Sequence, residues 1–205
     1  MSEGRARVAS LSSLRSEAAA CTRCDLYRDA TQTVFGAGPA SARLVMIGEQ
    51  PGDKEDLDGH PFVGPAGKLL DRALDAAGLD RGTVYLTNAV KHFKWKRGNG
   101  KVRLHQKPNR EEVRACACWW EAELDAVKPE LVVLLGATAA QAVLGPKVRV
   151  TRDRGLVMAP TEAVPYATLM TVHPSAILRT RPPERDAAFD ELVRDLRVAT
   201  EHLGS

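Results

Sequence analysis

The sequence has no hydrophobic run that approaches the length of a membrane span, and it contains few cysteines. A transmembrane helix needs about 18 or more consecutive apolar residues, so we expect no contact with a membrane. The first 21 residues, MSEGRARVASLSSLRSEAAAC, have no apolar core of the kind that marks a secretory signal. Only four of the 205 residues are cysteines. We therefore expect a cytoplasmic protein whose cysteines are not paired in disulfides.

Acidic residues are absent from one segment, 91–110 (KHFKWKRGNGKVRLHQKPNR), which holds eight Lys and Arg residues. Because the whole chain has 29 basic and 26 acidic residues, the remainder carries 21 basic against 26 acidic. Clustered Lys and Arg are typical of contacts with a polyanion such as a nucleic-acid backbone. A solvated lysine-rich loop is the alternative, and composition does not separate the two. Residues 97–108 follow neither a helical nor a strand period, which predicts a flexible positive loop that carries His105.

Four nearly continuous apolar segments alternate with amphipathic ones along the chain. The predicted strands are 43–49, 83–90, 130–136 and 166–172. The predicted helices are 11–20, 64–79, 109–127, 137–145 and 184–203, with Asn109 as the N-cap of the third. Strands that are apolar on both faces and alternate with helices favour a mostly parallel sheet. We predict one domain, residues 1–205, that forms a three-layer α/β/α sandwich around a four-stranded sheet.

Polar side chains follow the predicted strands at the points where the strands end. The four strands lead into GEQPGD, TNAVKH, GATAA and TVHPSAILR. Ligands of a parallel sheet bind beyond the carboxyl ends of its strands, so Glu49, Gln50, Asn88 and His173 are expected to meet there. The glycine-rich segment 48–70 also belongs to this edge, and Phe62 within it either offers a flat face to an aromatic ligand or joins the core.

These segments together resemble the motifs of uracil-DNA glycosylases, in the iron–sulfur branch related to family four. The motifs are GEQPGDKEDLDGHPFVGPAGKLLD (48–71), YLTNAVKH (85–92) and HPSAILR (173–179), and the similarity extends from Cys21 to about Arg179. The insertion KWKRGNGKVRLHQKP (94–108) resembles the loop of the UdgX subgroup. Members of that subgroup excise uracil and remain covalently attached to the DNA through a loop histidine, which by position is His105.

The resemblance implies a role for each residue at the strand ends. Phe62 is expected to stack on a uracil flipped out of the DNA. Asn88 is expected to pair with the N3–H and O4 of the base, because an amide offers both a donor and an acceptor. His173 is expected to stabilise the departing uracil anion at O2, and Glu49 to serve as the catalytic carboxylate.

In the same reading, His105 takes the place of water as the nucleophile at the sugar C1′. Either Glu49 or Gln50 is expected to orient its ring, and Gln50 is also placed among the uracil-binding residues. The residues expected to contact DNA are Lys101, Arg103, Lys107 and Arg179. The expected partner is uracil-containing DNA, single-stranded, bound by a monomer. Two alternatives stay open: a turnover glycosylase that releases abasic DNA, and a non-catalytic nucleic-acid-binding module stabilised by a metal.

The cysteines form a second group of candidate functional residues. Cys21 and Cys24 have the spacing of metal ligands. The resemblance implies a third ligand after the TNAVK strand, where this chain has His92, and a fourth at Cys116, which leaves Cys118 as a spare thiol. Such a set is expected to hold a four-iron, four-sulfur cluster, with zinc in a Cys₃His site as the alternative. Either group would tie the N-terminal segment to the base of the positive loop.

Overall fold

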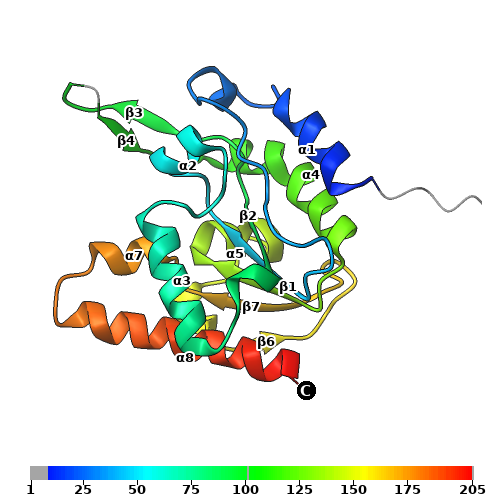
Figure 1. Cartoon of the computed structure of the whole chain (residues 1–205), viewed down its shortest axis with the longest axis vertical. Coiled ribbons are helices and arrows are strands. Elements are labelled where there is room, and N and C mark those ends of the chain that lie inside the picture. Colours follow the sequence, from blue (N-terminus) through cyan, green and yellow to red (C-terminus); the bar gives the residue numbers. More distant parts are fainter. Residues whose placement is uncertain (1–8, 101, 205) are drawn as a thin grey trace, which may run out of the picture.

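The computed structural model describes residues 9–100 and 102–204, and it contains a central sheet between two layers of helices (Figure 1). Its strands are β1 (Leu44–Gly48), β2 (Val84–Asn88), β5 (Leu131–Leu135), β6 (Val157–Met158) and β7 (Ala167–Thr171), in the order β2-β1-β5-β7-β6. The four predicted strands pair in parallel, so the predicted fold class is confirmed. The sequence did not indicate β6, which runs antiparallel along β7 and has only two residues, too few to show a period.

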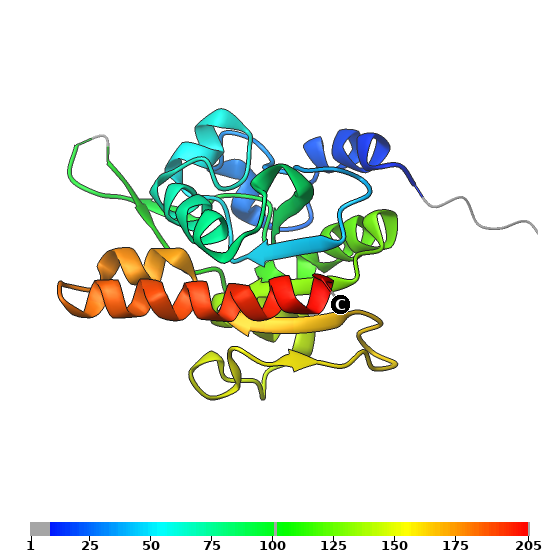
Figure 2. The same cartoon turned by 60° about the horizontal axis from the view of Figure 1, so that its bottom comes forward.

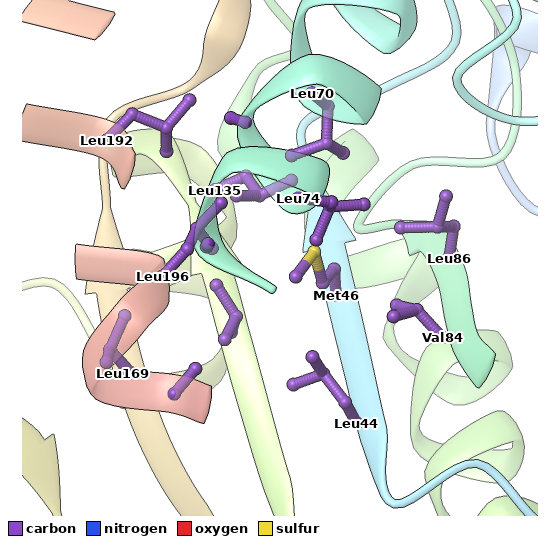
Figure 3. Close-up of a cluster of buried hydrophobic side chains, with 14 of the residues drawn as sticks. Leu44, Met46, Leu70, Leu74, Val84, Leu86, Leu135, Leu169, Leu192 and Leu196 are labelled. Carbon is purple, nitrogen blue, oxygen red and sulfur yellow. The ribbon is translucent and has the colours of Figure 1, made fainter. Parts of the chain in front are cut away.

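The four parallel strands are buried along their whole length, as their continuous apolar sequences require. Their side chains alternate between the two faces. On one face Met46 meets α3 (Pro65–Ala77) and α8 (Glu184–Gly204), with Leu70 and Leu196 between the helices and the sheet (Figure 3). On the other face Val45 joins Trp120 of α4 (Arg110–Val127) and Ala140 of α5 (Gly136–Leu144).

Shorter elements complete the fold. They are α1 (Leu11–Ala19), η1 (Asp25–Arg28), α2 (Asp53–Asp58), η2 (Arg81–Thr83), α6 (Val150–Asp153) and α7 (Pro174–Arg179). The predicted N-cap of α4 is confirmed, because Asn109 Oδ1 accepts a hydrogen bond from the Glu112 N–H and the Glu112 carboxylate accepts one from the Asn109 N–H. No helix within the described ranges has both the length and the apolar character that crossing a bilayer requires.

The segment predicted as an irregular loop contains a two-stranded hairpin. Strands β3 (Trp95–Arg97) and β4 (Arg103–His105) pair antiparallel, with Trp95 opposite His105 and Arg97 opposite Arg103. The hairpin extends away from the sheet, toward the side of the molecule where α7 lies (Figures 1 and 2). Strands of three residues are too short to reveal a period of two, so no strand could be predicted here from the sequence.

Candidate active site

The structure contains a cavity of about 1050 Å³ at the carboxyl ends of the parallel strands. Its lining includes eight of the residues that the sequence singled out: Glu49, Gln50, Phe62, Asn88, His105, Lys107, His173 and Arg179. The topology explains this convergence. Strands β2, β1, β5 and β7 lie side by side in the same direction, so the residues that follow them reach the same edge of the sheet.

Phe62 and Asn88 form one wall of the cavity. Phe62 is buried and adopts a left-handed backbone conformation with a φ of 59°, which is uncommon for a residue with a side chain. Both side chains lie directly against the backbone of Gly48, where an added Cβ would come within 2.6 Å of Phe62 Cζ and would also clash with Asn88 Oδ1. Lys91 Nζ donates a hydrogen bond of 3.0 Å to the Asn88 carbonyl. The Asn88 side-chain amide makes no hydrogen bond to any other described residue, so it is free for a ligand.

His173 lies on the opposite wall as the N-cap of α7. Its Nδ1 accepts a hydrogen bond of 3.1 Å from the Ser175 N–H, and its ring lies 6.2 Å from the Phe62 ring between centroids. Burial, with smaller contributions from the charges of Arg179 and His105, lowers the pKa of His173 to about 4. The ring is therefore neutral at pH 7. Because Nδ1 accepts a hydrogen bond, the single ring proton is on Nε2.

His105 and Glu49 face each other at the mouth of the cavity. His105 Nε2 lies 3.5 Å from Glu49 Oε1, and the other carboxylate oxygen, Oε2, accepts a hydrogen bond from Thr138 Oγ1. Burial lowers the pKa of His105, while the nearby Glu49 carboxylate opposes that effect and Arg179 adds to it. A neutral imidazole thus lies next to a carboxylate, with both at the edge of the cavity.

Gln50 lines the cavity, but its side-chain amide is directed at the base of the hairpin. Its Nε2 donates to the carbonyls of Lys94 and Gln106 at 3.2 and 3.1 Å, and its Oε1 accepts from the Lys94 N–H at 3.3 Å. The sequence left open whether Glu49 or Gln50 orients His105. In the structure Glu49 faces the ring, whereas the Gln50 amide holds the two chains of the hairpin together. The catalytic and uracil-binding roles expected of the Gln50 side chain therefore receive no support from its geometry.

Three of the eight basic residues in segment 91–110 are engaged within the protein. Lys91 pairs with Glu123 at 2.6 Å with both side chains fully buried, and Lys94 pairs with Glu112 at 2.9 Å. The third is Arg103.

Arg103 was expected to contact DNA, and in the structure its guanidinium contacts other residues of the protein. Its guanidinium pairs with Asp53 at 2.5 Å and Asp56 at 2.6 Å, and it lies over the Phe93 and Trp95 rings. These ion pairs have a physical reason: Arg103 points to the inner face of the hairpin, where buried Asp56 needs a counter-charge.

The remaining predicted DNA contacts differ in what the structure describes. Lys107 lines the cavity and forms no ion pair with any described residue, and the exposed Lys96 and Arg97 of β3 are also unpaired among those residues. Arg179 also lines the cavity, beside Leu178, and donates a hydrogen bond of 3.3 Å to Ser175 Oγ. Lys101 lies outside the described residues.

The predicted metal ligands border one corner, where the N-terminal segment meets α4. Cys24 packs beside Cys116, and the proximity of the two thiols lowers the pKa of Cys24 to about 6 and, together with burial, raises the pKa of Cys116. Cys21 Sγ accepts a hydrogen bond of 3.2 Å from Trp119 Nε1. His92 Nε2 and Thr33 Oγ1 share a hydrogen bond of 2.8 Å. The buried Nδ1 of His92 has no hydrogen-bond partner among the described residues.

These four side chains do not converge on one point. Within residues 9–100 and 102–204, no three His, Cys, Asp or Glu side chains are close enough to hold a single metal ion. Zinc requires four donors at about 2.0–2.3 Å from one atom, so this arrangement does not fit the zinc alternative. A four-iron cluster binds each ligand through a different iron atom, which allows a wider spacing, and the unpartnered Nδ1 of His92 is a donor that such a group would satisfy.

Three residues that make contacts at this site were not predicted from the sequence. Thr138 contacts the Glu49 carboxylate, and Asp53 and Asp56 form ion pairs with Arg103. The signal for Thr138 was present, because GATAA follows the β5 strand at the same edge of the sheet. A threonine at a helix start, however, is also an ordinary helix residue, so its type did not distinguish it.

Comparison with known proteins identifies the family of this chain. Residues 35–197 match the family model of the uracil DNA glycosylase superfamily, so the chain belongs to that superfamily. Its curated relatives include the type-4 uracil-DNA glycosylase of Thermotoga maritima, which is 37% identical over 80% of this chain and 81% of its own length. The type-4 enzyme of Pyrobaculum aerophilum is 33% identical over 87% of both chains, and that of Archaeoglobus fulgidus is 40% identical over 64% of this chain and 62% of its own.

Proposed function

We propose that this uracil-DNA glycosylase excises uracil from DNA and then remains bonded to the sugar C1′ through His105. One observation carries the proposal: His105 Nε2 lies 3.5 Å from Glu49 Oε1 at the mouth of a cavity that Phe62, Asn88 and His173 also line. A neutral imidazole offers a nucleophile, and the carboxylate beside it can stabilise positive charge on the sugar and then on the ring.

Recognition of the base follows from the two side chains at Gly48. A uridine must leave the base stack, at a cost of a few kcal/mol, before the cavity can receive it. The Phe62 ring is proposed to stack on the flipped base, and the unbonded amide of Asn88 to pair with N3–H and O4. Cytosine presents the opposite donor and acceptor pattern. An amide that lies against Gly48 in the orientation that suits uracil is mismatched to cytosine.

Departure of the base places negative charge on uracil and positive charge on the sugar. His173 is neutral and carries its proton on Nε2, so it is suited to donate a hydrogen bond to uracil O2 as that charge develops. Glu49 is suited to stabilise the sugar cation, because it is the carboxylate at the cavity mouth. The bond between C1′ and N1 breaks, and its electron pair leaves with uracil.

The covalent step uses the same carboxylate. In this step neutral His105 carries its ring proton on Nδ1, and the lone pair of Nε2 forms the bond to C1′ beside Glu49, whose negative charge stabilises the imidazolium that results. The imidazolium releases its Nδ1 proton to solvent, so the sugar ends on a neutral, substituted imidazole. The uracil anion takes up one proton from solvent and leaves as the neutral base, so the step as a whole moves one proton from His105 to uracil. Lys107 and Arg179, which flank the cavity, are proposed to hold the phosphates of the strand, which we propose to be single-stranded DNA bound by a protein monomer.

The test is a denaturing gel after incubation with a uracil-containing single-stranded oligonucleotide. We expect a band that is shifted and stable to heat and detergent with the wild-type protein. His105→Ala should abolish this band and still release uracil, because Phe62, Asn88 and His173 are intact. Abasic DNA without a shifted band from the wild type would instead indicate turnover with water, and intact DNA would indicate a binding module without catalysis.

We also propose that Cys21, Cys24, His92 and Cys116 hold a four-iron, four-sulfur cluster. The support is the contact between Cys24 and Cys116 and the unpartnered Nδ1 of His92 in the same corner. The cluster would supply a structural crosslink between the N-terminal segment and the base of the hairpin. It has no part in the steps above.

Iron content and visible absorbance test the cluster. We expect the protein purified without oxygen to be brown, to contain about four irons per chain, and to bleach on reduction. His92→Ala should lower the melting temperature and the iron content together. A colourless protein that contains zinc would contradict the proposal.

A further inference from the structure

Thr138 has no place in the mechanism above, yet it contacts the central carboxylate. It lies in the first turn of α5, lines the cavity and is 7% exposed. Its Oγ1 donates a hydrogen bond to Glu49 Oε2. Among the described residues this is the only hydrogen bond that the Glu49 side chain receives, since His105 approaches the other oxygen at 3.5 Å.

The fold brings Thr138 to this point without a connecting loop. Strands β1 and β5 are parallel neighbours, with Ile47 opposite Leu134, so Glu49 and the start of α5 leave the sheet side by side. Gly136 has a φ of 86°, and this left-handed conformation lets α5 begin directly after β5. A Cβ at Gly136 would also lie only 2.8 Å from His173 Cβ. The same turn thus places Thr138 against Glu49 and leaves room for His173.

We propose that Thr138 is a positioning residue for the reaction, and this inference rests on the function proposed above. Its hydroxyl holds Oε2, so that Oε1 is left facing His105 Nε2 and the sugar. The Glu49 side chain is 23% exposed and lies at the cavity mouth, where an unrestrained carboxylate has several rotamers and water as a partner. One fixed oxygen therefore determines where the other one is. A carboxylate oxygen that already faces the sugar and the attacking ring stabilises the positive charge that develops on them without first having to reorient.

The experiment compares Thr138→Val and Thr138→Ala, which remove the hydroxyl, with Thr138→Ser, which keeps it. The measurements are the maximal single-turnover rate of uracil release, the DNA concentration at half-maximal rate, and the fraction of covalent adduct. Thr171→Val is the matched control, because Thr171 Oγ1 also donates to a buried carboxylate, Asp195, but neither side chain lines the cavity. Thermal melting of each variant reports any loss of fold.

We expect Thr138→Val and Thr138→Ala to lower the maximal rate roughly ten- to a hundredfold, with the half-saturating DNA concentration unchanged. Thr138→Ser should restore the rate to within about threefold of the wild type, and Thr171→Val should change the melting temperature without changing the rate. Wild-type rates in folded Thr138→Val, or no rescue by Thr138→Ser, would overturn the inference and leave the glycosylase function standing. A wild-type protein that releases no uracil would overturn the proposed function itself, and this inference with it.

Discussion

At the scale of single residues, the proposed chemistry depends on two histidines that are both neutral but have different roles. His173 is partly buried, and its Nδ1 accepts a hydrogen bond from the Ser175 N–H, so its Nε2–H is a donor. His105 is half-exposed beside Glu49, and burial lowers its pKa, so its ring is available as a nucleophile at pH 7. A protonated His105 would have no lone pair to donate. The two roles therefore come from the surroundings of each ring.

The low pKa of His173 makes the stability of the protein depend on pH. The folded-state pKa is about 4, below the ordinary value of 6.5, so between these values the unfolded chain binds a proton that the folded chain does not. The free energy of unfolding should therefore fall as the pH drops from 6.5 to 4, by up to about 3 kcal/mol from this residue.

Urea denaturation across this pH range measures the effect. His173→Gln should weaken the dependence of the free energy of unfolding on pH. The pKa values of His92 and His105 are also lowered, so a smaller dependence of the same sign should remain. His60→Gln is the control, since His60 is exposed outside the cavity lining and pairs with Asp58. An unchanged slope in His173→Gln would show that His173 is not buried as a neutral ring.

The sequence predicted which residues meet at the site more accurately than it predicted the directions of their side chains. Glu49, Asn88 and His173 follow parallel strands, and topology alone brings them to one edge of the sheet. The direction of the Gln50 amide depends on carbonyls of Lys94 and Gln106, which are 44 and 56 residues away. No local pattern encodes contacts of that kind, so the prediction for Gln50 had no physical basis beyond its position.

At the scale of elements, the hairpin β3–β4 carries His105 and is held against α2 by Arg103, two positions before it. Residues 103 and 105 of a strand point to the same face, so Arg103 and His105 both face the body of the protein. Arg103 is anchored there by Asp53 and Asp56 of α2, and Asp56 also accepts hydrogen bonds from Thr31. The ion pairs therefore fix the distance from α2 to His105, the proposed nucleophile.

Arg103→Ala should separate the two halves of the reaction. A hydrogen-bonded charge pair of this kind is worth about 1.5–3 kcal/mol, or a tenfold or larger change in the population of the docked hairpin. We expect covalent adduct to form roughly tenfold more slowly while uracil release continues. Arg97→Ala is the control, because Arg97 lies directly opposite Arg103 in the hairpin, is exposed, and forms no ion pair with a described residue. Equal adduct rates in Arg103→Ala and wild type would refute the anchoring role.

The hairpin also marks the limit of prediction at this scale. The main helices and strands are long and periodic, and the bounds predicted for them differ from the structure by only a few residues. Strands β3 and β4 have three residues each and are stabilised by pairs with distant segments, such as the Trp95 Nε1 hydrogen bond to the Asp29 carbonyl. Tertiary contacts, rather than local propensity, create this element.

At the scale of the whole molecule, one buried ion pair links the cavity to the second helix layer. Lys91 Nζ donates to Thr87, to the Asn88 carbonyl and to Glu123 of α4, and Glu123 also accepts from the Gly36 N–H and the Tyr85 hydroxyl. Both charges are fully buried, so each requires the other. The strand that carries Asn88 is thereby locked to the helix that carries Cys116.

The charge pattern of the sequence needed the whole fold before it could be interpreted. Eight basic residues in one segment predicted a polyanion contact, but Lys91, Lys94 and Arg103 neutralise carboxylates inside the protein. The residues left for DNA lie around the cavity and on the outer part of the hairpin. Family membership then supports a uracil-DNA substrate, which charge alone did not specify.

The proposed reaction ends in a bond between one ring nitrogen of His105 and the sugar C1′. Mass spectrometry of the protein after reaction with a deoxyuridine oligonucleotide, followed by digestion with a protease and a nuclease, measures this bond directly. We predict a peptide that contains residue 105 and carries the added mass of the sugar-phosphate, with fragmentation that assigns the addition to His105. Unmodified peptide throughout, or an adduct on another side chain, would contradict the account.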